Sequence, residues 1–285
     1  MNIEYFYKPH IDLIYHILAH IKVNNASDLY SSTYVKKMAK LQCNTTLVVP
    51  DKLIEYYNQN FDKLGIINFI PFFCDSFESF EKSICSFNQF ASNDIDRFIN
   101  PLIDLCKTQK DFYFKYWEEQ HLNNGWQQCI EKAFNDKICR FKCLFDYYSK
   151  SAKVYFSLSL TKNGRGIGGF PHHFVAYVPF PKAEEEIDNS FFIFLHECTH
   201  QMTDSLLQMD INMNDGSHDI SENVVILFDY LLIKTLSAED IHSYILWISK
   251  NCSLSGITEK NFFDFFSVPG HISTSMDDLL GNLLK

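Results

Sequence analysis

The chain has 285 residues, of which 46% are hydrophobic and 21% charged, so it can bury a substantial core as one large domain or two closely packed ones. No uninterrupted apolar run approaches the length needed to span a membrane, which argues against a transmembrane helix. Residues 1 to 23 carry charges and histidines among their apolar positions and lack a small-residue cleavage site, so we expect no secretory signal peptide.

The formal charge of −10 is spread unevenly, with −1 over residues 1 to 150 and −9 over residues 151 to 285. An acidic surface repels phosphates and anionic lipids, so this charge argues against nucleic acid and membranes as partners and favours cationic or neutral substrates. Solubility alone is the alternative explanation for the charge. Nine cysteines without a repeated spacing fit reduced thiols better than a disulfide framework, which predicts a cytoplasmic protein.

Helical periodicity dominates the first half of the chain. His16 and His20 lie four residues apart in the first periodic segment, but no glutamate accompanies them, so we interpret them as packing or surface residues. We expect residues 1 to 150 to form a helical lobe, and nothing in this segment points to its role. The predicted helices are 11–22, 28–41, 52–60, 76–88, 94–120 and 126–150.

Two alternating segments follow the helical half. Residues 153–160, KVYFSLSL, and residues 173–180, HFVAYVPF, each alternate with period two, and the glycine-rich stretch TKNGRGIGG lies between them. This pattern predicts two antiparallel strands joined by a flexible hairpin turn. The glycines do not match GxGxxG and no helix follows them directly, so a phosphate-binding loop is not indicated.

The stretch FFIFLHECTHQMTD, residues 191–204, carries a metal-binding pattern. On a helix, His196 and His200 lie on one face one turn apart, so both imidazoles can bind one metal ion, while Glu197 stands beside the open coordination site. The apolar FFIFL indicates that this helix runs through the core, which argues against a chance occurrence of the pattern. Cys198 lies about 200° around the helix from His196, so we expect it in the core rather than at the metal.

The rest of the chain is predicted to be helical. An apolar helix over 218–236 carries Glu222 near its N-terminal end, where a carboxylate either caps the helix or binds a cation. Further helices are predicted over 238–250, 259–267 and 275–284, and a loop containing His271 precedes the last of them.

These residues together resemble the gluzincins, the zinc peptidases whose third ligand is a glutamate on a helix downstream of HExxH, and locally the thermolysin family. The likeness covers roughly residues 190 to 235: residues 196–204 match the form HExTHxxTD, and Glu222 stands where the third ligand belongs. The resemblance implies an α+β, predominantly helical protein with a zincin-like catalytic half over residues 151–285, in which a small antiparallel strand pair precedes the HExxH helix. It implies Zn²⁺ bound by His196, His200 and Glu222, with Glu197 as the general base.

The chain departs from the family pattern at two positions. Family members often have asparagine before the ligand glutamate and an acid four residues after it, where this chain has Ser221 and Ile226. His218, one turn before Glu222, is therefore a rival third ligand, although Glu222 is preferred.

Residues that support the ligands can also be nominated. Asp229 lies on the same helix face as Glu222 and is a candidate for orienting a ligand through a hydrogen bond. Asp204, one turn beyond His200, either orients that imidazole in the same way or only covers the helix surface. Gluzincins also stabilise the oxyanion with a tyrosine or histidine from beyond the third-ligand helix. His271 is slightly preferred because of its predicted loop. The candidates for this role are Tyr230, His242 and His271.

The predicted function is that of a cytoplasmic zinc metallopeptidase, a hydrolase whose peptide or protein substrate is held along the strand of residues 173–180. Two alternatives from other classes stay open: a catalytically silent peptide-binding or regulatory protein with a metallopeptidase fold, and a metal-dependent hydrolase of a non-peptide amide. The intact Glu197 argues against the first. The substrate sequence, the choice between endo- and exopeptidase, and the oligomeric state are left open by the sequence.

Overall fold

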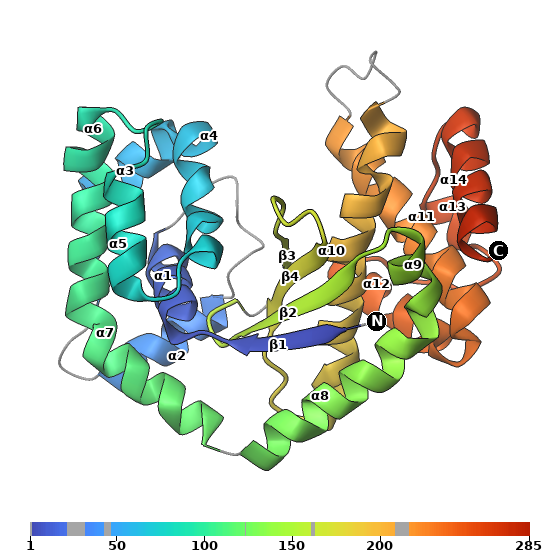
Figure 1. Ribbon diagram of the computed structural model, residues 1–285, viewed down its shortest axis with the longest axis horizontal. Helices are drawn as coiled ribbons and strands as arrows, with labels where there is room; N and C mark the ends of the chain where they lie inside the picture. Colours follow the sequence, from blue (N-terminus) through green and yellow to red (C-terminus); the bar gives the residue numbers. More distant parts are fainter. Residues whose placement is uncertain (1, 22–31, 43–46, 123, 161–162, 209–216) are drawn as a thin grey trace.

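The computed structural model describes residues 2–21, 32–42, 47–122, 124–160, 163–208 and 217–285, with all their side chains except those of 124, 204–208 and 217–219. It is predominantly helical with one small sheet, which confirms the α+β class (Figure 1). The strands are β1 (Ile3–Tyr7), β2 (Ser151–Ser157), β3 (Arg165–Gly166) and β4 (His173–Pro179). The helices are α1 (Pro9–His20), α2 (Ser32–Gln42), α3 (Asp51–Gln59), α4 (Phe61–Leu64), α5 (Phe77–Cys85), α6 (Ser92–Asp94), α7 (Asn100–His121), α8 (Asn124–Ile138), α9 (Lys142–Tyr147), α10 (Ile187–Gln208), α11 (Ser217–Leu236), α12 (Ile241–Asn251), α13 (Phe262–Phe265) and α14 (Gly270–Leu283). Short helical segments are η1 (Gly65–Asn68), η2 (Ile70–Phe73), η3 (Ile95–Ile99), η4 (Cys139–Phe141), η5 (Glu184–Glu186) and η6 (Ala238–Asp240).

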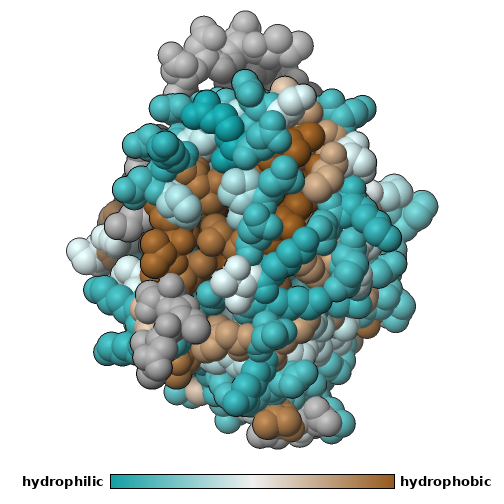
Figure 2. All heavy atoms as spheres, turned by 90° about the vertical axis from the view of Figure 1, so that its left-hand side faces the viewer, coloured by the Kyte–Doolittle hydropathy of each residue, from teal (hydrophilic) through white to brown (hydrophobic). Residues whose placement is uncertain are grey.

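The sheet lies between two groups of helices (Figure 1). Helices α1 to α7 gather on one side of it, where α1 packs against α7, and α10 to α14 gather on the other, where α10 packs against both β4 and α11. Figure 2 shows the outer face of the first group, on which apolar side chains form an area bordered by hydrophilic ones. Among the described helices, none is both long and apolar enough to cross a membrane.

The strand pairing differs from the predicted hairpin. The strand order is β1-β2-β4-β3, with β1, β2 and β4 parallel and only β3 antiparallel to its neighbour β4. The predicted antiparallel pairing of residues 153–160 with 173–180 is therefore wrong. Side chains alternate in the same way along parallel and antiparallel strands, so the sequence pattern could not distinguish the two. The chain reverses direction twice between β2 and β4, because the glycine-rich stretch contains β3 rather than a simple turn.

Strand β4 is an interior strand. It bonds to β2 along its whole length and to β3 at Tyr177 and Ala176, so six of its seven residues are buried. A peptide cannot add to a strand whose two edges are occupied. The prediction that residues 173–180 hold the substrate is therefore wrong, and the free edges of the described sheet belong to β1 and β3.

Strand β1 was missed by the sequence analysis. Its sequence, IEYFY, consists mainly of β-branched and aromatic residues, and the proline at the start of α1 ends it, which are local signals for a strand. Tyr5 and Tyr7 stack on Phe156 of β2 at ring-centroid distances of 6.2 and 5.4 Å. The sheet thus contains residues from both sides of position 150, and the division into a helical lobe and a catalytic domain there stays a prediction.

Several predicted helices are confirmed with small shifts of their ends, namely those over 11–22, 52–60, 76–88 and 94–120. The helix predicted over 126–150 is interrupted by η4 between α8 and α9. The loop predicted around His271 is wrong, because Pro269 stands at the N-cap and Gly270 begins α14.

Asp12 of α1 joins the first helical group to the sheet. Its side chain is fully buried and accepts hydrogen bonds from the Ser157 hydroxyl at 2.6 Å, the Leu158 amide at 3.1 Å and the Trp117 indole at 3.1 Å. The hydroxyl of Tyr177 donates to the same carboxylate. A buried carboxylate is tolerated only when its oxygens are bonded in this way, so the network fixes α1 and α7 against the ends of β2 and β4.

Replacement of Asp12 by alanine should lower the free energy of unfolding by about 2–5 kcal/mol, because it leaves several buried donors without an acceptor. Urea denaturation of the Asp12→Ala variant measures the loss. The exposed Asp104 offers the control, since Asp104→Ala removes the same charge from a solvated position. Equal stability of the two variants would show that the network contributes nothing.

Candidate metal centre

Two packed helices carry the three candidate ligands. In α10 the residues from Phe191 to Leu195 are each at most 3% exposed, so the helix runs through the core as predicted and holds His196 and His200 in fixed positions. Helix α11 packs against α10 and brings Glu222 to the same point. Cys198 is fully buried in the core cluster, which confirms the predicted core position.

The three side chains converge closely. The Nε2 atoms of His196 and His200 are 3.2 Å apart, and the two carboxylate oxygens of Glu222 lie 3.3 Å from Nε2 of His196 and 3.4 Å from Nε2 of His200. The side chains are partly accessible, with 15% of His196, 25% of His200 and 37% of Glu222 exposed. Among the described residues, this is the group of histidine, cysteine and acidic side chains whose geometry could hold a metal ion.

The separations fit a tetrahedral ion. Bonds of about 2.0–2.1 Å from zinc to nitrogen and oxygen, set at tetrahedral angles, place the ligand atoms about 3.4 Å apart. The three observed distances lie within 0.2 Å of this value. Three protein ligands in such an arrangement leave a fourth position for water or substrate, which is the usual form of a catalytic site.

Asp229 contacts the ring nitrogen of His196 that does not face the other two candidate ligands. One oxygen of this fully buried carboxylate lies 3.1 Å from Nδ1 of His196, and the other accepts a hydrogen bond from the Thr199 hydroxyl at 2.5 Å. A proton on Nδ1 directs the lone pair of Nε2 toward the centre. The predicted role of Asp229 in orienting a ligand agrees with this contact.

The electrostatic environment of the site favours a cation. Burial lowers the pKa of His196, but the hydrogen bonds to Asp229 and Glu222 outweigh it and raise the pKa to about 10. The negative charge of Glu197 acts in the same direction. The carboxylates around this imidazole therefore stabilise a positive charge on it.

Glu197 is held by the edge strand. Its Oε2 accepts a hydrogen bond from the Gly166 amide at 2.6 Å. A Cβ at Gly164 would lie 2.3 Å from the Ile193 side chain and 3.0 Å from that of Glu197, so only glycine allows the chain to pass this close to α10. The glycine-rich stretch is thus a close contact with the helix, and the predicted flexible turn does not describe it.

Trp247 of α12 was not identified from the sequence. Its ring centroid lies 6.2 Å from that of His196, and its indole donates a hydrogen bond to the side-chain oxygen of Asn189 at 3.0 Å. The residue gives α12 an apolar contact with the ligand helix. Its spacing in α12 is that of any core-facing aromatic residue, so no local signal distinguishes it.

The predicted oxyanion residues lie on three helices. Tyr230 is fully buried, its hydroxyl donates to the Glu259 carbonyl at 3.4 Å, and its ring stacks on Phe262, which argues against a role at the metal centre. His242 on α12 and His271 on α14 are exposed, and their role stays a prediction. The side chains of the candidates Asp204 and His218 lie outside the described residues.

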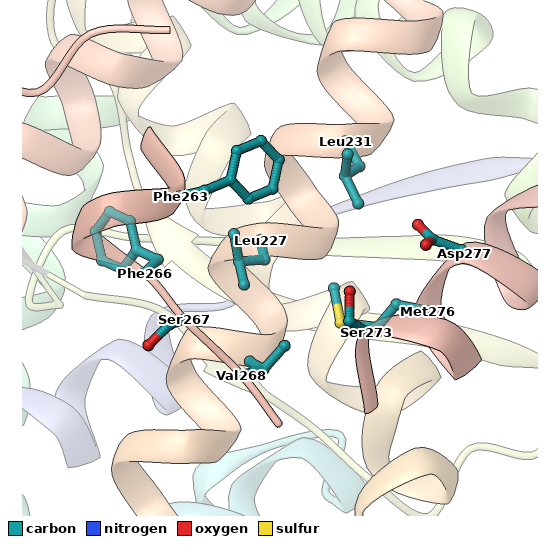
Figure 3. A pocket seen from close by; sticks show the side chains of 9 residues that line it. All are labelled: Leu227, Leu231, Phe263, Phe266, Ser267, Val268, Ser273, Met276 and Asp277. Atoms are coloured by element: carbon teal, nitrogen blue, oxygen red, sulfur yellow. The ribbon is translucent and has the colours of Figure 1, made fainter. Parts of the chain in front are cut away.

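Another face of α11 lines a separate cavity. Leu227 and Leu231 point from α11 into a space of about 380 Å³ whose lining also includes Phe266, Met276 and Asp277 (Figure 3). Leu227 is two positions before Asp229, about 200° around the helix, so this cavity opens on the side of α11 away from the metal centre.

Comparisons of the chain with protein-family models, with curated proteins and with solved structures gave no match. The assignment of a function therefore depends on the geometry of the site itself. Three features are available for it: a convergent donor set, a glutamate next to His196 in the sequence whose charge acts on that imidazole, and a sheet edge in contact with the glutamate.

Proposed function

We propose that the chain is a zinc-dependent peptidase of the gluzincin type, in which His196, His200 and Glu222 hold the ion. The observation that carries this proposal is the convergence of three ligand atoms within 4.8 Å of one another. Two histidines and a glutamate are a known ligand set for catalytic zinc. Asp229 supports the set because a carboxylate behind a metal-binding histidine fixes the orientation of its ring.

Glu197 is proposed as the general base. When bound, the ion lowers the pKa of a water molecule to about 7 and polarises the substrate carbonyl. Glu197 accepts the proton of the attacking water and passes it to the nitrogen of the leaving amine. The amide of Gly166 fixes one carboxylate oxygen of Glu197, so the side chain is oriented before the substrate arrives.

Strand β3 is proposed as the docking edge for an extended peptide. Ile167 donates its amide to Val175 of β4, and amides alternate in direction along a strand, so Gly166 directs its own amide away from β4 and toward Glu197. Because this amide is already bonded to Glu197, a peptide beside β3 would pair through the outward-facing carbonyl of Gly166, next to the general base. Backbone pairing at a strand edge binds substrates of varied sequence, because the contacts involve only main-chain groups.

Metal analysis together with a peptide-library digest tests the proposal. We expect about one zinc ion per chain and cleavage of library peptides, with both lost after treatment with a strong chelator and both restored by added zinc. Cleavage that survives complete removal of metal would exclude a metal-dependent mechanism. Stoichiometric zinc without any cleavage would favour the silent binding protein, and cleavage of small amides but not of peptides would favour the non-peptide hydrolase.

A chelator titration should identify the third ligand. Replacing Glu222 with alanine removes a ligand atom 3.3 Å from His196, so zinc affinity should fall more than about a hundredfold. His218→Ala should have a smaller effect. Asn223→Ala, which changes the neighbouring position, serves as the control and should leave the affinity unchanged. A larger loss in His218→Ala than in Glu222→Ala would assign the ligand to His218.

A further inference from the structure

Arg165 of β3 is a positive charge without a counter-charge. Within the described part of the chain, no carboxylate pairs with its guanidinium, and its Nε is buried without a hydrogen-bond partner. Arginine cannot lose its proton under ordinary conditions, so the charge persists despite partial burial. A buried donor left unbonded is unfavourable for folding, which suggests that a ligand supplies the missing acceptor.

A cavity of about 440 Å³ contains this arginine. Its wall is formed by residues of α4 and η1 from the first helical group together with Arg165 from the sheet. Lys63 also lines it, but this lysine is paired with Asp94 at 2.5 Å. Asp62 is a lining residue that is exposed to solvent, and it forms no ion pair with Arg165. Of the two basic residues that line the cavity, Arg165 is therefore the one whose charge is available to a ligand.

The positive charge of Arg165 acts on two tyrosine hydroxyls of the first helical group. Burial raises the pKa of Tyr15 and of Tyr57, and in each case the positive charge of Arg165 opposes that rise. Both hydroxyls are already bonded to Asn68. The Tyr15 hydroxyl donates to the main-chain carbonyl of Asn68 at 2.7 Å, and the side-chain amide of Asn68 donates to the Tyr57 hydroxyl at 3.2 Å. These neutral groups do not neutralise the guanidinium.

The position of Arg165 links the cavity to the candidate reaction centre. Its neighbour Gly166 donates the hydrogen bond to Glu197, and Arg165 itself pairs with Tyr177 in the sheet. A substrate that lies along β3 therefore passes Glu197 and the mouth of the cavity within one or two residues of each other. The side chain of Arg165 lines the cavity together with residues of α4 and η1 from the first helical group.

We propose that Arg165 determines substrate specificity by binding a carboxylate of the peptide in this cavity. The inference rests on the peptidase function proposed above. The planar guanidinium forms two parallel hydrogen bonds with a carboxylate, a geometry that neither a lysine nor a neutral donor reproduces. The carboxylate belongs either to an aspartate or glutamate side chain of the substrate or to its C-terminus, and the chemistry at Arg165 is the same.

A kinetic panel of matched peptides tests the proposal. Each peptide carries glutamate, glutamine or lysine at one position near the cleaved bond and ends in a free or an amidated C-terminus. For the wild-type protein, kcat/KM should be about ten- to a hundredfold higher for the peptides that carry the recognised carboxylate than for the matched peptides that lack it. The difference should arise mainly from a lower KM. If faster cleavage depends on the glutamate, Arg165 binds the side-chain carboxylate of the substrate. If faster cleavage is lost when the C-terminus is amidated, Arg165 binds the C-terminal carboxylate.

Substitutions separate binding from structure. Arg165→Gln should abolish the preference for the acidic peptides, and Arg165→Glu should reverse it in favour of lysine. Arg97→Gln is the matched control: Arg97 lies over the ring of Tyr56, outside the cavity, and its loss should leave the preference intact. Because the guanidinium is unpaired, the melting temperature of Arg165→Gln should not be lower than that of the wild type.

Two results would overturn the inference while leaving the peptidase intact. One is equal cleavage of acidic, neutral and basic peptides by the wild type. The other is an Arg165→Gln protein that keeps the acidic preference but melts at a lower temperature, which would make the arginine structural. If the wild type cleaves no peptide of any charge, the proposed peptidase function fails and the specificity inference fails with it.

Discussion

Replacing Glu197 with glutamine is expected to lower kcat/KM for peptide cleavage by about a hundredfold to ten-thousandfold, the usual contribution of a general base. Glutamine has the same size and keeps an oxygen that can accept the hydrogen bond of the Gly166 amide. It cannot take up the proton of the attacking water. Folding, zinc content and peptide affinity should therefore remain close to those of the wild type.

Steady-state kinetics with metal analysis of the same preparation checks this result. Glu185→Gln provides a matched control, because Glu185 is an exposed residue of η5 and its neutralisation should leave the rate unchanged. An undiminished rate in Glu197→Gln with full zinc content would remove Glu197 from the reaction. A lower zinc content in that variant would instead indicate that the carboxylate binds the ion.

The second large effect is expected in the double variant His196→Ala, His200→Ala, which should lose its bound zinc and all detectable cleavage. Two of the three convergent donors are removed, and a single carboxylate does not retain zinc against a chelator. Zinc per chain after dialysis is the measurement. The variant also leaves one oxygen of the buried Asp229 carboxylate without its histidine partner, so circular dichroism must accompany the metal analysis.

A histidine pair away from the site gives the control for that experiment. His172 and His173 stand at the start of β4, the first exposed and the second partly buried, so their joint replacement removes two imidazoles without opening the core. This control should retain about one zinc per chain. Full zinc retention by His196→Ala, His200→Ala would show that the ion binds elsewhere or not at all.

The sequence was most informative where the geometry is local. Four residues along a helix return to the same face, so the spacing of His196 and His200 was enough to predict that their rings meet. Spacing alone does not make a site, as the pair His16 and His20 demonstrates. Its ring centroids are 4.7 Å apart, the same as those of His196 and His200, yet His16 is fully buried against Tyr113 in the core.

The features that were missed depend on contacts between distant residues. No local pattern records that Ile3 pairs with Ala152, or that the strands on either side of the glycines run parallel. The contact between Gly166 and Glu197 spans 31 positions and involves a main-chain amide, which leaves no mark on residue choice except the glycine itself. Glu222 stood out as a carboxylate near the start of an apolar helix, where helix capping and cation binding were both open, and only the resemblance to the gluzincins made it the predicted third ligand.

The pairing of β1 with β2 also constrains the order in which the protein can fold. β1 is synthesised before its partner β2, whose paired residues follow 149 positions later, a delay of about 7–30 seconds at about 5–20 residues per second. During that time the apolar strand is without its sheet and depends on chaperones or on its neighbouring helices for protection. A fragment that begins at residue 151 has the complementary problem, because the edge of β2 that β1 covers is then open to pairing with other chains.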